Sequence, residues 1–313
     1  MDPALALDLG GTKVEAALVT ADGAVVAGSR HRRPTGPTAT SADLAQAVTD
    51  VVTAALAPVG GAVAGIGIGS AGPIDRPAGA ASPLNLPVWR GFPLRDHVAD
   101  VARALGLPPA APVRLEMDGI CIALAEHWLG AARGSDDVMG MIVSTGIGGG
   151  LILGGRVVPG PTGNAGHVGH IAAAGHDEPC PCGGRGCVEA VASGPSSVRW
   201  ARAQGWGGST GEDLAAGVAA GDPIALAAVE RAGRALGSAL ASATALVDVE
   251  VIAIGGGFSR VSPDLLDIVR DEIARHAGFG FVTKVRVVPS GLGDEGPLVG
   301  AAALVHRPEL LAG

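Results

Sequence analysis

The chain has 313 residues, of which 48% are hydrophobic and 17% charged, so it is a globular rather than an intrinsically disordered protein. Its formal net charge of -8 disfavours nonspecific nucleic-acid binding, and its N-terminus lacks the basic segment and apolar core of a secretory signal. The apolar runs are broken by glycine and too short to span a bilayer. We therefore expect a cytoplasmic protein of two domains that binds neither nucleic acid nor a membrane.

The first part of the chain predicts alternating strands and helices. Strands are expected over residues 5–9, 14–20, 24–33, 62–72 and 113–118. Helices are expected over residues 42–56, 94–105 and 123–131, with Ser41 as the N-cap of the first. Between the fourth strand and the second helix lies a loop rich in proline and glycine, which carries the segment NLPVWRG.

The second part of the chain begins like the first. Residues 138–158 predict a strand, a glycine-rich turn and a strand, and this pattern weakly echoes residues 5–26. Helices are then expected over residues 196–204, 211–219 and 223–246, followed by a strand over 249–257, a helix, a strand over 284–290 and a last helix from about residue 297. The pattern predicts an α/β fold with two similar lobes and a cleft between them.

Three glycine-rich turns follow strands: DLGGTK at residues 8–13, STGIGGG at 144–150 and GGG at 255–257. Glycine lets backbone N–H groups approach an anion closely. None of the turns has the Walker A spacing, and none is a convincing Rossmann fingerprint. Each turn alone is better explained as a plain hairpin. Three in one chain, two of them opening equivalent lobes, favour nucleotide phosphates in the cleft.

Residues 166–187, GHVGHIAAAGHDEPCPCGGRGC, contain three histidines and three of the four cysteines. Three thiolates, from Cys180, Cys182 and Cys187, lie in one short loop, and a closed set of three cysteines and one histidine is typical of structural zinc. The fourth ligand can be any of the three histidines in this segment. Reduced core cysteines are the alternative, which the CPC spacing and the following glycine turns disfavour. Cys121, near a helix start, is expected to be a packed thiol.

Several of these segments together resemble the ROK family of sugar kinases and sugar-responsive repressors. The resemblance lies in LALDLGGTKVEAALV, SPLNLPVWRG, EMDGICIALAEHWLGAA, IVSTGIGGGLILGG, GHVGH with CPCGGRGCVEAVASG, and VIAIGGG, in the family's order. It implies a two-lobed actin-like (ribonuclease H-like) ATPase or sugar-kinase fold with an interlobe cleft. The implied small lobe comprises residues 1–117 and 298–313, and the large lobe comprises 118–297 with a zinc-binding loop over 166–189.

The resemblance also implies an activity and roles for individual residues. The activity is phosphorylation of a hexose by ATP with Mg²⁺, usually at the 6-hydroxyl, and Asp118 is the implied base for the sugar hydroxyl. Asp118 also suits a helix N-cap, and the two roles are compatible. ATP is expected to meet Gly10, Gly11, Thr12, Lys13, Thr145 and Gly146 through its phosphates, Gly256 and Gly257 near the adenosine, and Asp8 near the metal.

The implied sugar-binding residues are Gly72, Asn85, Met117, Asp118, His167, His170 and Glu189. Without the resemblance, Asn85 fits a loop turn and Glu189 a solvent-facing helix position equally well. His170 is the implied fourth zinc ligand, which leaves His176 as an exposed bystander. Family members that are repressors carry a DNA-binding segment before the first turn, and because DLGGT begins at residue 8 we expect none here. A homodimer or homotetramer is implied by the resemblance alone.

Two positions depart from the family's usual sugar site. His167 stands where the family's kinases typically have the glutamate of E-x-G-H, and Met117 stands where they have the asparagine of N-D. A carboxylate accepts two hydrogen bonds, a neutral imidazole accepts one and donates one, and a thioether offers apolar surface. We therefore expect a working kinase for an amino-, N-acetylamino- or epimeric hexose such as kanosamine. The alternatives are an ordinary glucokinase and a non-catalytic sugar-binding or regulatory protein.

Overall fold

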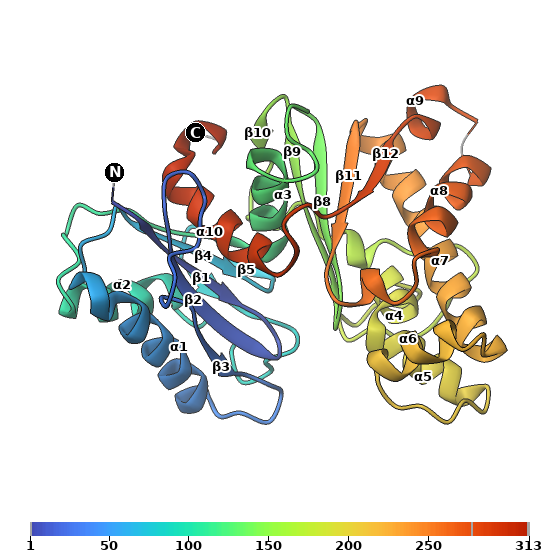
Figure 1. Ribbon diagram of the computed structural model, residues 1–313, viewed down its shortest axis with the longest axis horizontal. Coiled ribbons are helices and arrows are strands. Elements are labelled where there is room, and N and C mark those ends of the chain that lie inside the picture. The colour runs from blue at the N-terminus through green and yellow to red at the C-terminus, as the bar shows by residue number, and fades with distance from the viewer. Residues whose placement is uncertain (1, 277, 312–313) are drawn as a thin grey trace.

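Two five-stranded sheets lie at the centre of two lobes in the computed structural model, which describes residues 2–276 and 278–311 (Figure 1). The strand orders are β3-β2-β1-β4-β7 and β10-β9-β8-β11-β12. The first sheet contains β1 (Ala4–Leu9), β2 (Lys13–Val19), β3 (His31–Pro34), β4 (Ile66–Ser70) and β7 (Val113–Met117). The second contains β8 (Val138–Val143), β9 (Ile147–Leu153), β10 (Arg156–Val157), β11 (Val251–Gly255) and β12 (Arg286–Pro289). A separate hairpin consists of β5 (Ile74–Asp75) and β6 (Ala80–Ala81).

The two sheets are built in the same way around their first hairpins. β1 pairs antiparallel with β2 and parallel with β4, and β8 pairs antiparallel with β9 and parallel with β11. The pair Leu9↔Val14 closes the first hairpin, and Val143↔Ile147 closes the second. The internal echo in the sequence therefore falls on equivalent hairpins, and each hairpin turn carries one of the first two glycine-rich motifs.

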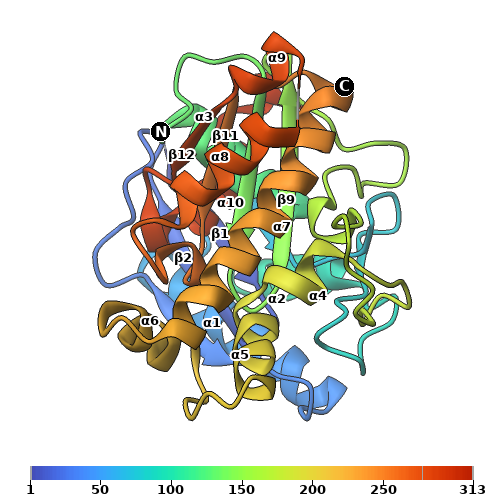
Figure 2. The same cartoon turned by 90° about the vertical axis from the view of Figure 1, so that its right-hand side faces the viewer.

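Helices cover the outer faces of both sheets. α1 (Ser41–Leu56) and α2 (Leu94–Ala104) lie with the first sheet. Figure 2 shows α7 (Pro223–Val247) and α8 (Leu265–His276) in front of the second sheet. The same lobe contains α4 (Val188–Ala192), α5 (Gly194–Ala203), α6 (Gly211–Ala219) and α9 (Gly280–Thr283). Short 3-10 turns span Ala57–Val59, Val168–His170, Phe258–Arg260, Gly293–Glu295 and Pro308–Leu310.

Two further helices, α3 (Asp118–Trp128) and α10 (Gly296–His306), cross between the sheets. α3 follows β7 of the first sheet but packs on β8 and β9 of the second, whereas α10 follows β12 of the second sheet and packs on β1 and β4 of the first. The two helices also pack against each other (Figure 1). A Cβ on Gly300 would lie 1.8 Å from the carbonyl oxygen of Cys121, so only glycine permits this approach. Asp118 therefore lies where the chain passes from one lobe to the other.

The expected N-cap of the first helix was wrong by one residue. Thr40 caps α1: its side chain accepts a hydrogen bond from the Asp43 N–H, and the Asp43 carboxylate accepts one from the Thr40 N–H. This reciprocal pattern satisfies two backbone donors at once, which Ser41 cannot do from the first helical position. The Ser41 hydroxyl instead accepts a hydrogen bond from the indole of the buried Trp89 at 3.0 Å.

Other boundaries also differ from expectation: the strand expected over residues 62–72 is shorter, as β4, and so is the strand expected over 249–257, as β11. The strand expected over residues 24–33 is reduced to β3, because Gly28 takes a left-handed φ of 76° and turns the chain. The helix expected from residue 123 begins at Asp118, so that Met117 rather than Asp118 occupies the N-cap position. Cys121 then lies one turn inside α3 and is a buried thiol, as expected.

One stretch among the described residues, Ser41–Val59, is long and apolar enough by composition to cross a membrane. Its apolar side chains, including Leu44, Val48, Val51 and Val52, are buried in the core of the first lobe. This one-sided burial is the pattern of an amphipathic core helix.

Candidate active site and metal cluster

A pocket between the lobes collects residues from both hairpin turns and from the start of α3. It contains every residue for which the sequence implied contact with ATP or sugar: Asp8, Gly10, Gly11, Thr12, Lys13, Gly72, Asn85, Met117, Asp118, Thr145, Gly146, His167, His170, Glu189, Gly256 and Gly257. These residues come from the two hairpin turns and the strand ends beside them, from the junction of β7 with α3, from the loops after β4, β6, β10 and β11, and from α4. The equivalent ends of the two sheets therefore converge on one cavity.

Asp118 begins α3 and faces this pocket. Its Oδ1 accepts a hydrogen bond of 2.7 Å from the Gly119 N–H. Burial raises the pKa of Asp118 to about 6, with the Gly119 N–H opposing the shift and the negative charge of Glu189 adding to it. A carboxylate with this pKa is mostly ionised at neutral pH and still has useful affinity for a proton, as a general base requires.

Asp8 ends β1 close to Asp118, and only 8% of its surface is exposed. Burial raises the pKa of Asp8 to about 7, and the charge of Asp118 adds to the shift while Lys13 opposes it. A divalent cation beside two such carboxylates would favour their ionised forms. Asp8 therefore fits a residue that holds Mg²⁺, directly or through water.

Lys13, which lines the same turn, is already paired with a second acidic residue. The buried carboxylate of Glu15 accepts hydrogen bonds from Lys13, from Arg30 at 3.2 Å and from Arg32 at 2.6 Å. Burial alone would raise the pKa of Glu15, but these cations lower it to about 2. The Lys13 ammonium therefore brings less net charge to the pocket than a free lysine. The motif DLGGTK did not indicate this pairing.

In each hairpin turn a glycine lies close to a side chain of the pocket. A Cβ on Gly11 would lie 2.7 Å from the Cβ of Asn85, and a Cβ on Gly146 would lie 2.7 Å from Oε2 of Glu189. The same Glu189 oxygen accepts a hydrogen bond of 2.7 Å from the Ile147 N–H. Asn85 is thus seated on the first turn and Glu189 on the second.

The two departures from the family pattern lie side by side. A Cβ on Gly72 would lie 3.0 Å from Cε1 of His167 and 3.2 Å from Sδ of Met117. Burial lowers the pKa of His167, and the nearby His170 lowers it further, so the imidazole is neutral at neutral pH. Met117 is 2% exposed. This wall of the pocket therefore combines an apolar thioether with an uncharged donor and acceptor.

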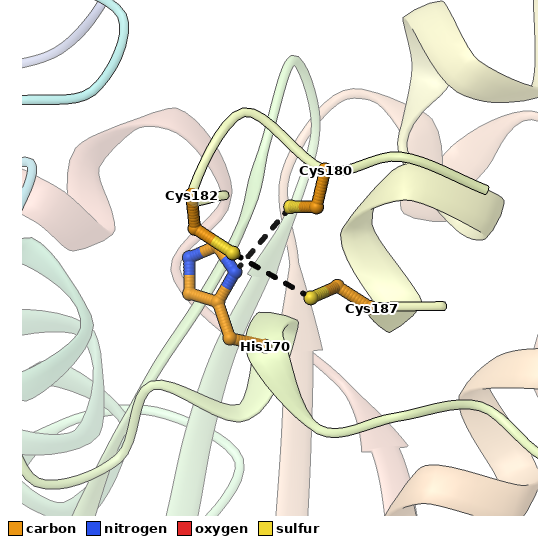
Figure 3. Close-up of side chains that lie close together, drawn as sticks. All are labelled: His170, Cys180, Cys182 and Cys187. Atoms are coloured by element: carbon orange, nitrogen blue, oxygen red, sulfur yellow. Dashed lines mark hydrogen bonds between the residues drawn. The ribbon is translucent and has the colours of Figure 1, made fainter. Parts of the chain in front are cut away.

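Four potential metal ligands converge beside this wall (Figure 3). The ligand atoms of His170, Cys180, Cys182 and Cys187 all lie within 4.8 Å of one another. The distance from His170 Nδ1 to Cys180 Sγ is 3.7 Å, as is that between Cys182 Sγ and Cys187 Sγ. A tetrahedron with the usual zinc–sulfur bond length has edges of about 3.8 Å. The donor set and its spacing therefore fit a four-coordinate zinc ion.

His167 and His176 lie outside this set of four ligands. His176 was expected to be exposed, but it is half-buried, and its Nδ1 lies 3.5 Å from Oε2 of Glu178. Glu178 also pairs with Arg231 of α7, and Asp177 pairs with Arg185. The loop that carries the cysteines is therefore held by ion pairs as well as by any metal, and His176 belongs to that support.

Several pocket residues were not expected from the sequence, among them Ile122, Ser290 and Asp294. The Ser290 hydroxyl donates a hydrogen bond of 2.5 Å to Glu126, a fully buried carboxylate of α3. Glu126 also accepts the N–H groups of Ala131 at 2.8 Å and Gly291 at 3.0 Å. Glu126 thereby attaches α3 to the chain between β12 and α10. No local pattern in the sequence pairs residues so far apart.

A second cavity adjoins the pocket beyond the third glycine turn. It shares Ser144, Thr145 and Gly257 with the first, and it is also lined by Phe258 and by Arg199, Arg202 and Arg260. The pocket therefore continues from the lobe junction toward α5 and α6.

The chain is similar to known proteins over nearly its whole length. The chain matches the ROK family over residues 4–308. It is similar to a glucokinase of Thermotoga maritima, with 32% identity covering 97% of each chain, and to an N-acetylmannosamine kinase of Shigella boydii serotype 18, with 33% identity covering 98% of this chain and 99% of the relative. Among solved structures, a ROK family glucokinase from Streptomyces griseus in complex with glucose and AMPPNP superposes with a TM-score of 0.84 at 31% identity, covering 97% of this chain and 99% of that one. The expected actin-like two-lobed fold is confirmed.

Proposed function

The chain belongs to the ROK family, and we propose that this sugar kinase transfers the terminal phosphoryl group of ATP to a hexose, at the 6-hydroxyl, with Asp118 as the base. The observation that carries this proposal is the convergence of Asp118 and both hairpin turns on a single pocket. A carboxylate alone would be an ordinary helix-start residue, and a glycine turn alone would be an ordinary hairpin. Their convergence provides both a proton acceptor and a phosphate cradle.

In this mechanism the protein mainly positions the reactants and stabilises charge. Asp118 accepts a hydrogen bond from the sugar hydroxyl, orients its oxygen toward the phosphorus and takes the proton as the new bond forms. The backbone N–H groups of the turns at residues 10–13 and 144–146 contact the phosphates, which they approach closely because of their glycines. Asp8 would hold Mg²⁺, directly or through water, and the bound ion would supply positive charge to the phosphates. The adenosine extends past Gly256 and Gly257 into the adjoining cavity.

We also propose that His170, Cys180, Cys182 and Cys187 hold a structural Zn²⁺. The cluster contributes no catalytic group, because a closed set of four protein ligands leaves no position for substrate. Its role is to hold the loop over residues 166–189 so that His167 and Glu189 face the sugar. His170 is proposed to bind through Nδ1, the ring nitrogen that lies 3.7 Å from Cys180 Sγ (Figure 3), and His170 also lines the pocket.

The sugar is proposed to be a modified hexose rather than glucose: an amino-, N-acetylamino- or epimeric hexose, of which kanosamine is one example. Within this set the structure favours an N-acetylamino sugar. The neutral His167 supplies no negative charge for an ammonium group but matches an amide, and the Met117 thioether suits a methyl group. The similarity to N-acetylmannosamine kinases supports this choice. The similarity to glucokinases keeps glucose as the alternative.

An ADP-release assay over a sugar panel tests the proposal. The panel contains glucose, glucosamine, kanosamine, N-acetylglucosamine, N-acetylmannosamine and allose. We expect the highest kcat/KM for an N-acetylamino hexose, and we expect Met117→Asn with His167→Glu to shift the preference toward glucose. Highest activity on glucose in the unaltered chain would contradict the modified-sugar proposal. Absence of turnover on the whole panel would favour a sugar-binding protein without catalysis.

The family resemblance supports three further proposals. The small lobe comprises residues 1–117 and 298–313 and the large lobe 118–297, although residues 1, 277 and 312–313 lie outside the described part of the chain. The protein acts in the cytoplasm, and it assembles as a homodimer or homotetramer.

A further inference from the structure

A side chain of one lobe pairs with the backbone of the other at the rim of the pocket. Asn164 lies in the loop between β10 and the 3-10 turn Val168–His170. Its Oδ1 accepts a hydrogen bond of 2.9 Å from the Ile74 N–H, and its Nδ2 donates one of 2.8 Å to the Ile74 carbonyl. Ile74 belongs to the β5–β6 hairpin and to the core of the first lobe. A single amide side chain thus pairs with Ile74 as a neighbouring strand would.

Residues on both sides of the pair Asn164 and Ile74 also lie close together across the two lobes. Toward the pocket, a Cβ on Gly72 would lie 3.0 Å from His167. Away from it, a Cβ on Gly163 would lie 2.8 Å from the Cβ of Arg76. Gly163 is buried and has a left-handed φ of 87°, so the loop lies flat against the hairpin only because this residue is glycine. The loop and the hairpin therefore touch at three successive places.

The hairpin is also attached to the strand that ends at the catalytic residue. Arg76 Nε lies 2.7 Å from Oε1 of Glu116, which is 3% exposed and sits in β7 directly before Met117. Arg76 therefore holds the hairpin against the strand leading to Asp118, and Asn164 holds the same hairpin against the loop leading to His167.

We propose that Asn164 is a positioning residue of the sugar site, an inference that rests on the proposed function. Its amide holds the two lobes together at the sugar end of the pocket, where Gly72, Met117 and His167 meet. Asn164 itself is not among the residues that line the pocket. It lies three residues before His167, so release of the amide from Ile74 frees the His167 segment to move away from Gly72. The phosphate-binding turns belong to other segments and keep their positions.

Kinetics of two variants test this role. Asn164→Ala removes both hydrogen bonds to Ile74, together with the longer ones of 3.2 and 3.3 Å that Nδ2 donates to Thr162 of the same loop. We expect the KM for the preferred sugar to rise about tenfold. The KM for ATP should stay within about twofold of the original. Asn164→Asp keeps the acceptor but sets a carboxylate oxygen against the Ile74 carbonyl, so its sugar KM should rise at least as much. Gln46→Ala is the matched control, because it removes an exposed amide that donates to Asp50 at 2.8 Å on α1. It should leave both constants unchanged.

Hydrogen exchange measures whether the contact between Asn164 and Ile74 is kept, and it does not depend on catalysis. In Asn164→Ala the Ile74 N–H should exchange faster, and in Gln46→Ala it should not. Faster exchange with an unchanged sugar KM would overturn the proposal, because the contact would then be lost without consequence for the sugar. A parallel rise in both KM values would also overturn it, since the effect would not be confined to the sugar site. Failure of the proposed function is distinct: the unaltered chain would then turn over no sugar in the panel.

Discussion

The two halves of the molecule share a strand order but bring different chemistry to the cleft. The first half contributes ionisable groups, with Asp8 and Lys13 on its hairpin turn and Asp118 at the end of β7. The equivalent turn of the second half, residues 144–146, contains only serine, threonine and glycine. One backbone arrangement thus carries charged side chains on its own turn in the first half, whereas in the second half the turn itself is uncharged and the carboxylate of Glu189 from α4 lies against it.

This difference assigns proton transfer and sugar binding to different groups of residues. Groups that gain or lose protons work best where burial and neighbouring charge can tune their pKa values, and the first half provides this for Asp8 and Asp118. The second half adds the cysteine loop, and in the proposed function this loop holds His167 and Glu189 at the sugar site. We therefore expect changes to Asp8 and Asp118 to affect mainly kcat, and changes in the cysteine loop to affect mainly sugar binding and stability.

The largest expected effect is that of Asp118→Asn. Loss of the base should lower kcat by about a thousandfold, with little change in the KM for sugar. The variant should also be more stable without ligands. The folded-state pKa of about 6 exceeds the ordinary 3.8, so the favourable contribution of the protonated carboxyl is complete below pH 3.8 and is lost as the pH rises through 6. Melting at pH 8 measures this gain. Retention of full activity would eliminate Asp118 as the base.

Loss of the metal cluster is expected to act mainly through the second half. Cys187→Ala should bind far less than one zinc per chain, lower the free energy of unfolding by about 3 kcal/mol and raise the sugar KM more than it lowers kcat. Cys121→Ala is the control, because Cys121 is a buried thiol outside the cluster. It should keep one zinc per chain. Metal analysis that finds no zinc in the unaltered protein would refute the structural zinc site.

The first hairpin turn offers a matched pair of glycine substitutions. A Cβ on Gly11 would meet the Cβ of Asn85 at 2.7 Å, whereas a Cβ on Gly10 would come no closer than 3.4 Å to Lys13. Gly11→Ala should therefore displace Asn85 and raise the sugar KM about tenfold, while Gly10→Ala should change it about twofold at most. Steady-state kinetics compares them. Equal effects of the two changes would show that the contact with Asn85 is not what requires glycine.

The smallest expected effect concerns the pKa of Asp118, which is raised in part by the charge of Glu189 in the second half. Because the base must be ionised, kcat/KM should fall about tenfold for each pH unit below 6. Glu189 of the second half raises the pKa of Asp118, so Glu189→Gln should move this acidic limb to lower pH by less than about one unit. Saturating Mg²⁺ keeps Asp8 ionised during the measurement. A limb that stays in place or moves to higher pH would contradict the assigned coupling.

Much of this site could be predicted because short stretches of the sequence indicate the strands and turns that form it. The strand–turn–strand patterns at the start of each half follow from alternating burial and glycine, and the resemblance to the ROK family added roles to residues within them. Segment boundaries were less accurate. Ser41 and Thr40 are both good N-caps, and only the position of Trp89 and the reciprocal bond with Asp43 distinguish them.

The sequence by itself indicated the two-lobed α/β fold class and the three glycine-rich turns, since both depend on short-range patterns of burial and turn chemistry. The roles of the residues that meet in the pocket came from the resemblance to the ROK family. Only the tertiary structure decided which distant groups become partners. It pairs Glu15 with Arg32, Glu126 with Ser290 and Asn164 with Ile74, and it brings His170, the ligand that the resemblance implied, beside the three cysteines. These choices depend on how strands pair and how α3 and α10 cross between the lobes, and hydrogen bonds a few ångströms long respond to that geometry rather than to proximity along the chain.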